Sequence, residues 1–289
     1  MIHDEKYQSL RRKIAALESA IVAYSGGADS ALLLRVARDV LGERALGVIA
    51  LSPSYAAGER EHARSFAAEQ GLPILEITTD EMDNPNYVAN AGDRCYYCKT
   101  ELFDKLEQIR QQRGYAVIID GFNADDVGDY RPGIRAAGEH YVVHPLQEAG
   151  LTKAEIRDIS HELGLKTWDK PAMPCLSSRV PVGTPIRIGT LRQIEESEQS
   201  LHDLGFRQVR VRHHGKIARI EVDVQDLQRL IAPGVREQVV AAVQKAGYAY
   251  VAVDLAGYRM GNLNPVGATQ ASPTEQGSLP TLTVPSQGS

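Results

Sequence analysis

The segment AIVAYSGGADS, at residues 20–30, joins a short apolar run to the start of a helical pattern. Its first five residues predict a buried strand, and the apolar residues after Ser30 recur at the spacing of one helix face until Gly42. The two glycines let the backbone bend sharply and approach a ligand closely. Because a helix begins with free N–H groups, this turn predicts an anion cradle of the kind that binds phosphate.

Strands and helices continue to alternate after this segment. Three more apolar runs have the length of buried strands, at residues 45–51, 73–78 and 115–120. Helical patterns lie between and after them, at about residues 56–70, 97–113 and 152–163. The last begins with a predicted capping box of Thr152 and Glu155. The pattern predicts an α/β fold with a parallel sheet covered on both faces, whose ligands bind at the carboxyl ends of the strands.

The pattern changes after residue 179. Thr190 and Gln193 form another predicted capping box at the start of a helix. Alternating apolar and polar residues on either side of HHGK predict an antiparallel hairpin, with His213 and His214 in its exposed turn. A small α+β unit is completed by a helix and a strand, at residues 234–245 and 248–255.

These changes divide the chain into three predicted parts. Residues 1–166 form the large α/β domain, and residues 167–264 form a small α+β domain that carries the loop around Cys175. Residues 265–289 are mostly Pro, Ser, Thr, Gln and Gly, almost without charge. Such a segment buries too little apolar surface to offset its ordering entropy, so it is predicted to be a disordered tail.

Composition narrows the class of protein. The 289 residues include 32 basic and 37 acidic side chains, a net charge of −5. Proteins that bind nucleic-acid duplexes usually carry a basic excess, so this balance argues against such a partner. No apolar stretch approaches the roughly 18 residues that span a bilayer, and the N-terminus is charged where a signal peptide is apolar. We therefore predict a cytoplasmic protein with no nucleic-acid or membrane partner.

The glycine turn contains an acidic residue, Asp29. A carboxylate repels phosphate unless a divalent cation lies between them, so Asp29 predicts a bound Mg²⁺. The turn has neither the G-x-G-x-x-G pattern of dinucleotide sites nor the lysine of the mononucleotide loop. The alternative is an ordinary strand–helix turn in which Asp29 and Ser30 cap the helix.

Three cysteines stand in polar surroundings. Cys95 and Cys98 form a CYYC motif at the predicted start of a helix, and Cys175 follows in PAMPCLSSR. The pair would suit a redox centre, and the three thiolates would suit either Zn²⁺ with one open position or three irons of a [4Fe–4S] cluster. Inert buried thiols are the remaining alternative. The glycine- and arginine-rich turns around these cysteines favour a chemical role.

SGGADS resembles the SGGxDS motif of the ATP-pyrophosphatases, also called PP-loop enzymes, which cleave ATP between the α and β phosphates and adenylate a carboxyl or carbonyl carbon. The resemblance implies a HUP-type sheet in residues 1–166, MgATP as cofactor, and adenylation. It assigns phosphate and Mg²⁺ contacts to Ser25, Gly26, Gly27, Asp29 and Ser30. It assigns adenosine contacts to Leu51, Ser52, Gly121, Asn123 and Asp125.

Longer motifs narrow the resemblance to one family of these enzymes. GDRCYYCKTELF, DGFNADD, DYRPG, KPAMPCLSSR and DLAGYRMGNLN together resemble the LarE family of ATP-dependent sacrificial sulfur transferases, over about residues 14–264. This implies a role in synthesis of the nickel-pincer nucleotide cofactor of lactate racemase. The enzyme would adenylate pyridinium-3,5-biscarboxylic acid mononucleotide, a nicotinic-acid-derived mononucleotide, and convert its carboxylates to thiocarboxylates. The family also implies a homo-oligomer, with residues 167–264 serving substrate binding and oligomerisation, and links to upstream and downstream enzymes of the pathway.

The family contains two kinds of sulfur source. Members with one cysteine, at the position of Cys175, give up its sulfur and retain dehydroalanine. Members with three cysteines hold a [4Fe–4S] cluster whose open iron carries sulfide. Because this chain has Cys95, Cys98 and Cys175, the resemblance implies the cluster type, with Cys175 as a ligand. Cys175 and Asp29 are the predicted catalytic residues.

A mononucleotide substrate also needs a site for its own phosphate. Arg210 and Arg212 alternate with valines in the predicted hairpin and so share one face. Guanidinium groups bind phosphate bidentately, which makes these two residues the candidates, with Arg179 near the donor sulfur and Glu198 as a further substrate contact. Cross-strand ion pairing on a solvated face is the alternative.

Other functions compete with sulfur transfer. A tRNA thiolase or an amide-forming synthetase of the NAD or GMP type would share the glycine turn. A thiolase should have a basic RNA-binding region, and a glutamine-using synthetase needs an ammonia supply that the sequence does not indicate. A nucleotide-binding sensor without catalysis would have no role for the three cysteines.

Overall fold

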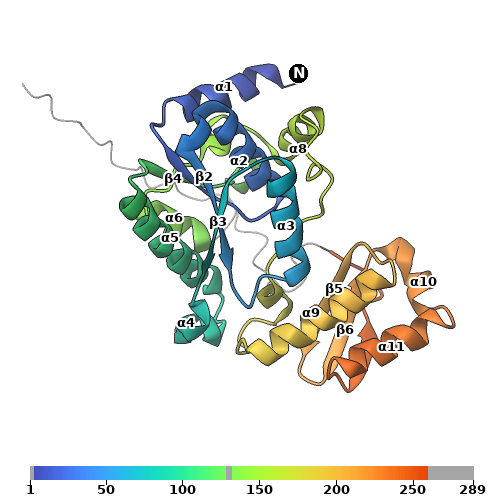
Figure 1. The fold of residues 1–289 in the computed structure, drawn as a ribbon. Coiled ribbons are helices and arrows are strands. Elements are labelled where there is room, and N and C mark those ends of the chain that lie inside the picture. Colours follow the sequence, from blue (N-terminus) through green and yellow to red (C-terminus); the bar gives the residue numbers. More distant parts are fainter. Residues whose placement is uncertain (1–2, 128–131, 260–289) are drawn as a thin grey trace, which may run out of the picture.

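The computed structural model describes residues 3–127 and 132–259 (Figure 1). The predicted tail at 265–289 lies outside the described residues. Within them, four parallel strands form one sheet in the order β3 (Ile74–Thr78), β2 (Ala45–Leu51), β1 (Ala20–Ala23) and β4 (Val117–Ile119). The predicted α/β fold with a parallel sheet is therefore confirmed.

Helices cover both faces of this sheet. Alternate residues of β1 belong to two different apolar cores, because successive side chains of a strand point to opposite faces. One face packs against α1 (Asp4–Ala15), α2 (Ala28–Leu41), α3 (Ala57–Glu69), α7 (Pro145–Glu148) and α8 (Lys153–Glu162). The other face packs against α5 (Arg94–Arg113) and α6 (Pro132–Glu139).

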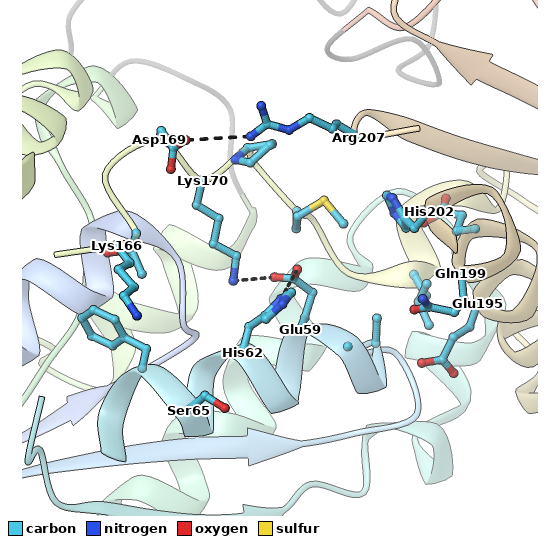
Figure 2. Close-up of a pocket in the computed structure, with 18 of the residues that line it drawn as sticks. Glu59, His62, Ser65, Lys166, Asp169, Lys170, Glu195, Gln199, His202 and Arg207 are labelled. Carbon is cyan, nitrogen blue, oxygen red and sulfur yellow. Dashed lines mark ion pairs between the residues drawn. The ribbon is translucent and has the colours of Figure 1, made fainter. Parts of the chain in front are cut away.

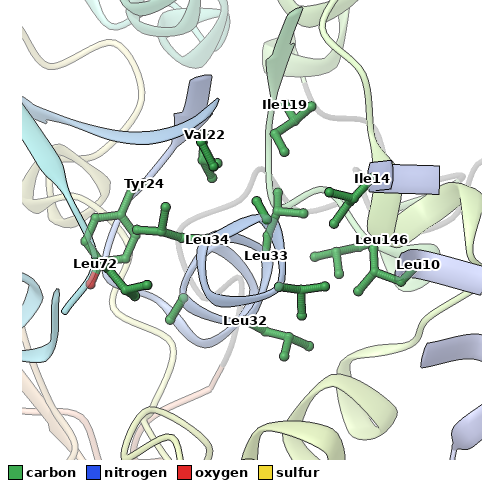
Figure 3. Packing of buried hydrophobic residues seen from close by; sticks show 14 of the residues in the cluster. Leu10, Ile14, Val22, Tyr24, Leu32, Leu33, Leu34, Leu72, Ile119 and Leu146 are labelled. Carbon is green, nitrogen blue, oxygen red and sulfur yellow. The ribbon is translucent and has the colours of Figure 1, made fainter. Parts of the chain in front are cut away.

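Helix α2, which follows the glycine turn, is buried over most of its surface, and Asp39 marks the part that reaches solvent. Leu32, Leu33 and Leu34 are consecutive, and each is 0% exposed. Figure 3 shows their side chains leaving α2 in different directions, with Tyr24 and Leu72 near Leu34. Because close packing surrounds most of this helix, the turn at its start is held firmly against the sheet.

A second group of elements follows the parallel sheet and lies beside it in Figure 1. Its sheet has the order β5 (Val209–His214), β6 (Ile217–Val222) and β7 (Tyr250–Val253), antiparallel between the first two strands and parallel between the last two. Helices α9 (Ile188–Asp203), α10 (Leu227–Ile231) and α11 (Val235–Lys245) accompany it. This group encloses its own apolar core, which contains Phe206 and Val211.

Short elements connect these parts. They are α4 (Pro85–Ala89) and the 3₁₀ turns η1 (Gly42–Arg44), η2 (Glu81–Asp83), η3 (Ala124–Asp126), η4 (Leu176–Arg179) and η5 (Val224–Asp226). No helix in residues 3–127 and 132–259 is both long and apolar enough to cross a membrane.

Two local predictions are wrong. Helix α9 begins at Ile188, and its N-cap is Arg187 in extended conformation, so Thr190 lies inside the first turn and caps nothing. The backbone N–H of Ile186 is bound to Val88, and this distant contact fixes where the helix begins. His213 and His214 belong to β5 and not to the turn, and His213 contacts the Tyr248 hydroxyl at 3.1 Å.

The capping box of α8 gives a testable stability difference. Thr152 Oγ1 accepts from the Glu155 N–H at 3.3 Å, and the Thr152 N–H donates to the Glu155 carboxylate at 2.9 Å. We expect Thr152→Ala to lower the free energy of unfolding by about 1 kcal/mol, measured by urea denaturation. Thr190→Ala is the matched control and should cost less than about 0.5 kcal/mol. Equal losses would contradict the assignment of the cap.

Candidate active site

A cavity of about 1160 Å³ opens at the carboxyl ends of β1 and β4. Since these strands are neighbours, the turn after β1 and the loop after β4 meet at one edge of the sheet. The lining includes Ser25, Asp29 and Ser30 from the first turn and Asp120, Gly121, Phe122 and Asp126 from the second loop. Arg94 and Cys95 from the start of α5, together with Pro174, also line it. The nucleotide motif and the cysteine motifs therefore face one space.

The glycine turn has the backbone geometry that its residues predict. Gly26 has a φ of +70°, and a Cβ atom there would lie 2.5 Å from Ala63 Cβ. The Ser25 and Ser30 hydroxyl groups lie 3.1 Å apart across the turn, and the Ser25 N–H donates to Ser30 Oγ. Lys170, which lies outside the turn, donates from its Nζ to the Gly26 carbonyl at 3.1 Å. The turn is thus closely packed on the side away from the cavity.

Gly26 and Gly27 should respond differently to alanine. At Gly26 the side chain would combine a left-handed backbone with a collision, and we expect a loss of about 2–3 kcal/mol in the free energy of unfolding. Gly27 caps α2 in extended conformation, and its Cβ would meet nothing nearer than Ser25 Oγ at 3.5 Å. Gly27→Ala should therefore cost less than about 1 kcal/mol. Denaturant titration of both variants checks this, and a larger loss for Gly27→Ala would refute it.

Asp29 lies at the start of α2 with its carboxylate in the cavity. One oxygen pairs with Lys153, from the first turn of α8, and the other, Oδ1, is buried and has no hydrogen-bond partner among the described residues. Burial raises the pKa of Asp29 above its ordinary value, against the opposing effect of Lys153, and the Asp126 carboxylate adds to the rise. Mg²⁺ is typically held by one or two carboxylates together with phosphates and water. An unsatisfied carboxylate oxygen beside a second carboxylate fits that ion.

The loop after β4 is organised by its own side chains. The Asn123 side chain accepts from the Asp125 N–H at 3.0 Å, and Asp125 accepts from the Lys153 N–H at 2.8 Å. These two residues hold the loop and do not line the cavity. Gly121 does line it, and a Cβ there would lie 3.0 Å from the Ser30 nitrogen. A side chain at residue 121 would thus press on the first turn of α2.

The structure places Leu51 and Ser52 outside the cavity lining. Leu51 ends β2 and packs against the core, while the Ser52 hydroxyl contacts that of Ser54 at 2.8 Å. Ile49 and Ala50, slightly earlier in the strand, line the cavity.

Asp120 and His144 are not among the predicted site residues, yet they are hydrogen-bonded at 2.7 Å and both line the cavity. Burial opposes ionisation of Asp120, but the His144 hydrogen bond prevails and keeps the pKa of the Asp120 carboxyl below its ordinary range. A usable signal was the position of Asp120 directly after an apolar strand.

All three cysteines are free thiols and lie near one another in space. Cys95 faces the cavity, whereas Cys98 packs against an apolar cluster that includes Tyr87 and Leu176. Burial and the nearby Cys175 raise the pKa of the Cys98 thiol to about 12 and also raise that of Cys95. Arg94, directly before Cys95, donates to the carbonyl of Ser177, two residues after Cys175, at 2.9 Å, so the two motifs meet.

No group of three His, Cys, Asp or Glu side chains in the described part of the chain converges on a single metal ion. The described residues therefore do not offer the Zn²⁺ site considered from the sequence. A [4Fe–4S] cluster binds each thiolate to a different iron, so its ligands stand farther apart than those of one ion. Three neighbouring free thiols, of which Cys95 lines the cavity, fit that donor set.

Arginines hold the backbone around Cys175. Arg179 forms a two-bonded ion pair with Glu198, both contacts at 2.9 Å, and also donates to the carbonyls of Pro174 and Cys175. Both side chains of the pair are nearly fully buried. Cys175 thus sits on a stretch whose carbonyls are bound by side chains.

Arg210 and Arg212 are buried. The alternative of ion pairs on a solvated face of the hairpin would leave both side chains exposed. Arg212 pairs with Glu221 at 2.9 Å and donates to the Ser178 carbonyl at 3.1 Å. Arg210 donates to the Ala172 carbonyl at 2.6 Å and has no carboxylate partner among the described residues. Burial, helped by the Arg179 charge, lowers the pKa of Arg210 to about 10. The polar face of β5 is covered by the stretch that carries Cys175.

A second cavity, of about 520 Å³, lies between α3 and α9. Figure 2 shows Lys170 extending to Glu59, and Asp169 beside Arg207. The Lys170–Glu59 ion pair measures 2.9 Å, and the Asp169–Arg207 pair 3.8 Å. Lys170, Pro171, Met173 and Leu176 line this cavity, whereas Pro174 lines the larger one. The Cys175 stretch therefore separates the two cavities.

Known proteins resemble this chain along most of its length, although no family model matches it. An uncharacterized protein of Synechocystis is 44% identical over 91% of this chain and 98% of its own length. The pyridinium-3,5-bisthiocarboxylic acid mononucleotide synthase of Lactiplantibacillus plantarum is 36% identical over 90% of this chain and 94% of its own. A subunit of the glutamine-hydrolyzing GMP synthase of Archaeoglobus fulgidus is 25% identical, over 74% and 75%. The chain therefore belongs to the family of pyridinium-3,5-bisthiocarboxylic acid mononucleotide synthases, the LarE family, within the PP-loop superfamily.

Proposed function

We propose that this protein is an ATP-dependent sulfur transferase that adenylates pyridinium-3,5-biscarboxylic acid mononucleotide and converts its carboxylates to thiocarboxylates. The observation that carries the proposal is that the PP-loop residues Ser25, Asp29 and Ser30 and the cysteine site at Cys95 face one cavity. The named synthase of L. plantarum, 36% identical to this chain, supports the same reaction. An amide-forming reaction like that of the GMP synthase relatives fits less well, because their identity is lower and amide formation gives the three cysteines no task.

The first step activates a poor electrophile. A substrate carboxylate oxygen attacks the α-phosphorus of ATP, the bond to pyrophosphate breaks, and an acyl-adenylate forms. The N–H groups and hydroxyls of the glycine turn would bind the phosphates, with Asp29 holding Mg²⁺ near Asp126. Lys153, which pairs with Asp29, would add a positive charge to the side of Asp29 where the phosphates bind.

The second step delivers sulfur. A sulfur nucleophile attacks the acyl carbon and AMP leaves. If Cys175 is the donor, the acyl–sulfur bond forms first, and loss of the Cys175 α-proton then breaks its Cβ–S bond, leaving dehydroalanine and a thiocarboxylate. If Cys95, Cys98 and Cys175 bind a [4Fe–4S] cluster, the open iron would supply sulfide instead. Three cysteines in one place favour the second source.

The substrate phosphate is assigned to the arginines of β5. Arg210 is the better supported of the two, because it has no carboxylate partner among the described residues, whereas Arg212 is paired with Glu221. Residues 172–178 cover Arg210 in this structure, so phosphate binding there requires that stretch to move. Arg179 and Glu198 stand beside Cys175 and would shape the position of the donor sulfur. A homo-oligomer and enzymes that supply the substrate and take up the product complete the proposed partners.

One anaerobic incubation tests the proposal. The purified protein, with its iron and sulfide content measured, is mixed with MgATP and pyridinium-3,5-biscarboxylic acid mononucleotide. We expect AMP, pyrophosphate and a thiocarboxylate product by mass spectrometry. About four irons per chain would identify the cluster source, and loss of one H₂S from Cys175 without iron would identify the consumed cysteine. ATP cleavage only with ammonia and another acceptor would overturn sulfur transfer in favour of amide formation.

A further inference from the structure

The two cysteine-bearing stretches are residues 85–98 and residues 175–186, and hydrogen bonds dock one on the other. The hydroxyl groups of Tyr87 and Ser177 meet at 2.8 Å in a buried contact. Backbone hydrogen bonds of 2.8 Å add to it, from Gly183 to Asn90 and from Ile186 to Val88. The relative position of the cysteines is therefore set where these stretches touch.

Asn90 is at the centre of this contact. It is 1% exposed and has a φ of +53°, a conformation that asparagine tolerates better than most residues. Its amide nitrogen donates to the carbonyls of Pro181 and Thr184, at 2.9 and 3.0 Å. Its amide oxygen accepts from Arg94 at 2.7 Å.

Arg94 joins both stretches through one nitrogen atom. It is the first residue of α5 and directly precedes Cys95. The same guanidinium nitrogen that binds Asn90 also donates to the Ser177 carbonyl at 2.9 Å. No carboxylate of the described residues pairs with Arg94. Its guanidinium is held by an amide oxygen of one stretch and a backbone carbonyl of the other.

Three other arginines bind the Cys175 stretch, on its side toward the small sheet. Arg179, Arg210 and Arg212 belong to η4 and β5, and they bind the carbonyls of Ala172, Pro174, Cys175 and Ser178. They fix the Cys175 stretch on the small sheet, but they make no hydrogen bond to α5 in the described structure. Arg94 alone of the four links that stretch to the helix that carries Cys95 and Cys98.

We propose that Arg94 is a positioning residue that holds the turn after Cys175 against the start of α5, so that the three sulfur atoms share one site. The proposal rests on sulfur transfer as the function. The other hydrogen bonds between the stretches reach residues 87–90, before α5 begins, so without Arg94 the start of α5 could shift relative to Cys175 by small motions. Displacements of about 1 Å at a reacting centre cost up to 100-fold in rate.

The test compares Arg94→Gln, Arg94→Lys and a control, Arg113→Gln, whose side chain is exposed at the other end of α5. Metal-free protein is treated with dibromobimane, which bridges two nearby thiols. Mass spectrometry then gives the ratio of Cys95–Cys175 to Cys95–Cys98 bridges. The second bridge lies within one helical turn and serves as an internal reference.

We expect Arg94→Gln to lower this ratio at least about fivefold, Arg94→Lys to recover most of it, and the control to match the wild type. Arg94→Gln should also lower thiocarboxylate formation about tenfold more than it lowers pyrophosphate release. An unchanged bridging ratio in Arg94→Gln would overturn the proposal, as would parallel losses of both products. If the wild type forms no thiocarboxylate, the proposed function fails, and the bridging ratio still decides the role of Arg94.

Discussion

Cys175→Ser should form thiocarboxylate at least about 10³-fold more slowly than the wild type, with a far smaller loss of pyrophosphate release. Serine can neither donate sulfur nor take the place of a thiolate on iron, so both proposed sulfur sources need Cys175. The PP-loop side of the cavity is made by other residues and should still activate the substrate. Anaerobic assays of both products, with the iron content of each preparation, measure the effect.

Cys98→Ser is the comparison that separates the two sources. If Cys175 is consumed, Cys98→Ser should still deliver one sulfur per chain, because Cys98 packs away from the cavity in an apolar cluster. If the cysteines bind a cluster, Cys98→Ser should lose iron and repeated turnover together. Normal thiocarboxylate formation by Cys175→Ser would disprove both routes.

Asp29→Asn should lower ATP cleavage by about 100- to 1000-fold. The substitution removes the charge that we assign to Mg²⁺ and breaks the ion pair with Lys153, while the amide keeps the size of the side chain. Pyrophosphate release measured over a range of Mg²⁺ concentrations should show weaker activation by the metal as well as a lower maximum.

Asp39→Asn is the matched control for Asp29→Asn. Asp39 lies on the same helix, is exposed, and pairs with Arg35 one turn earlier. Such surface pairs contribute little, so ATP cleavage by this variant should stay within about twofold of the wild type. If Asp29→Asn releases pyrophosphate at a rate close to that of the wild type, the assignment of Asp29 to the metal site is wrong.

The local features of the fold could be predicted from sequence because their causes are local. The apolar run at residues 45–51 is β2 with the same bounds, and the capping box of Thr152 and Glu155 is formed by the residues expected. A buried strand and a helix cap are each decided by a few neighbouring residues. Strand order, by contrast, depends on which distant strands pair, and the order β3-β2-β1-β4 leaves no signal in one sequence.

The burial of Arg210 and Arg212 could not be predicted for the same reason. Alternation along β5 correctly put the two arginines on one face of the strand, and that pattern ordinarily means an exposed face. What covers this face is a stretch from much earlier in the chain, at residues 172–178. A second non-local contact joins α4 to residues 176–186. It explains why α9 begins at Ile188, before the start that Thr190 predicts.

The shared cavity has a consequence for how tightly the two half-reactions are linked. An acyl-adenylate is prone to hydrolysis if it reaches bulk water before sulfur attacks it. Because the glycine turn and Cys95 border the same cavity, the activated intermediate does not have to diffuse from the site where it forms to the site where it reacts. We therefore expect little futile hydrolysis, with the number of ATP molecules cleaved for each sulfur delivered close to one.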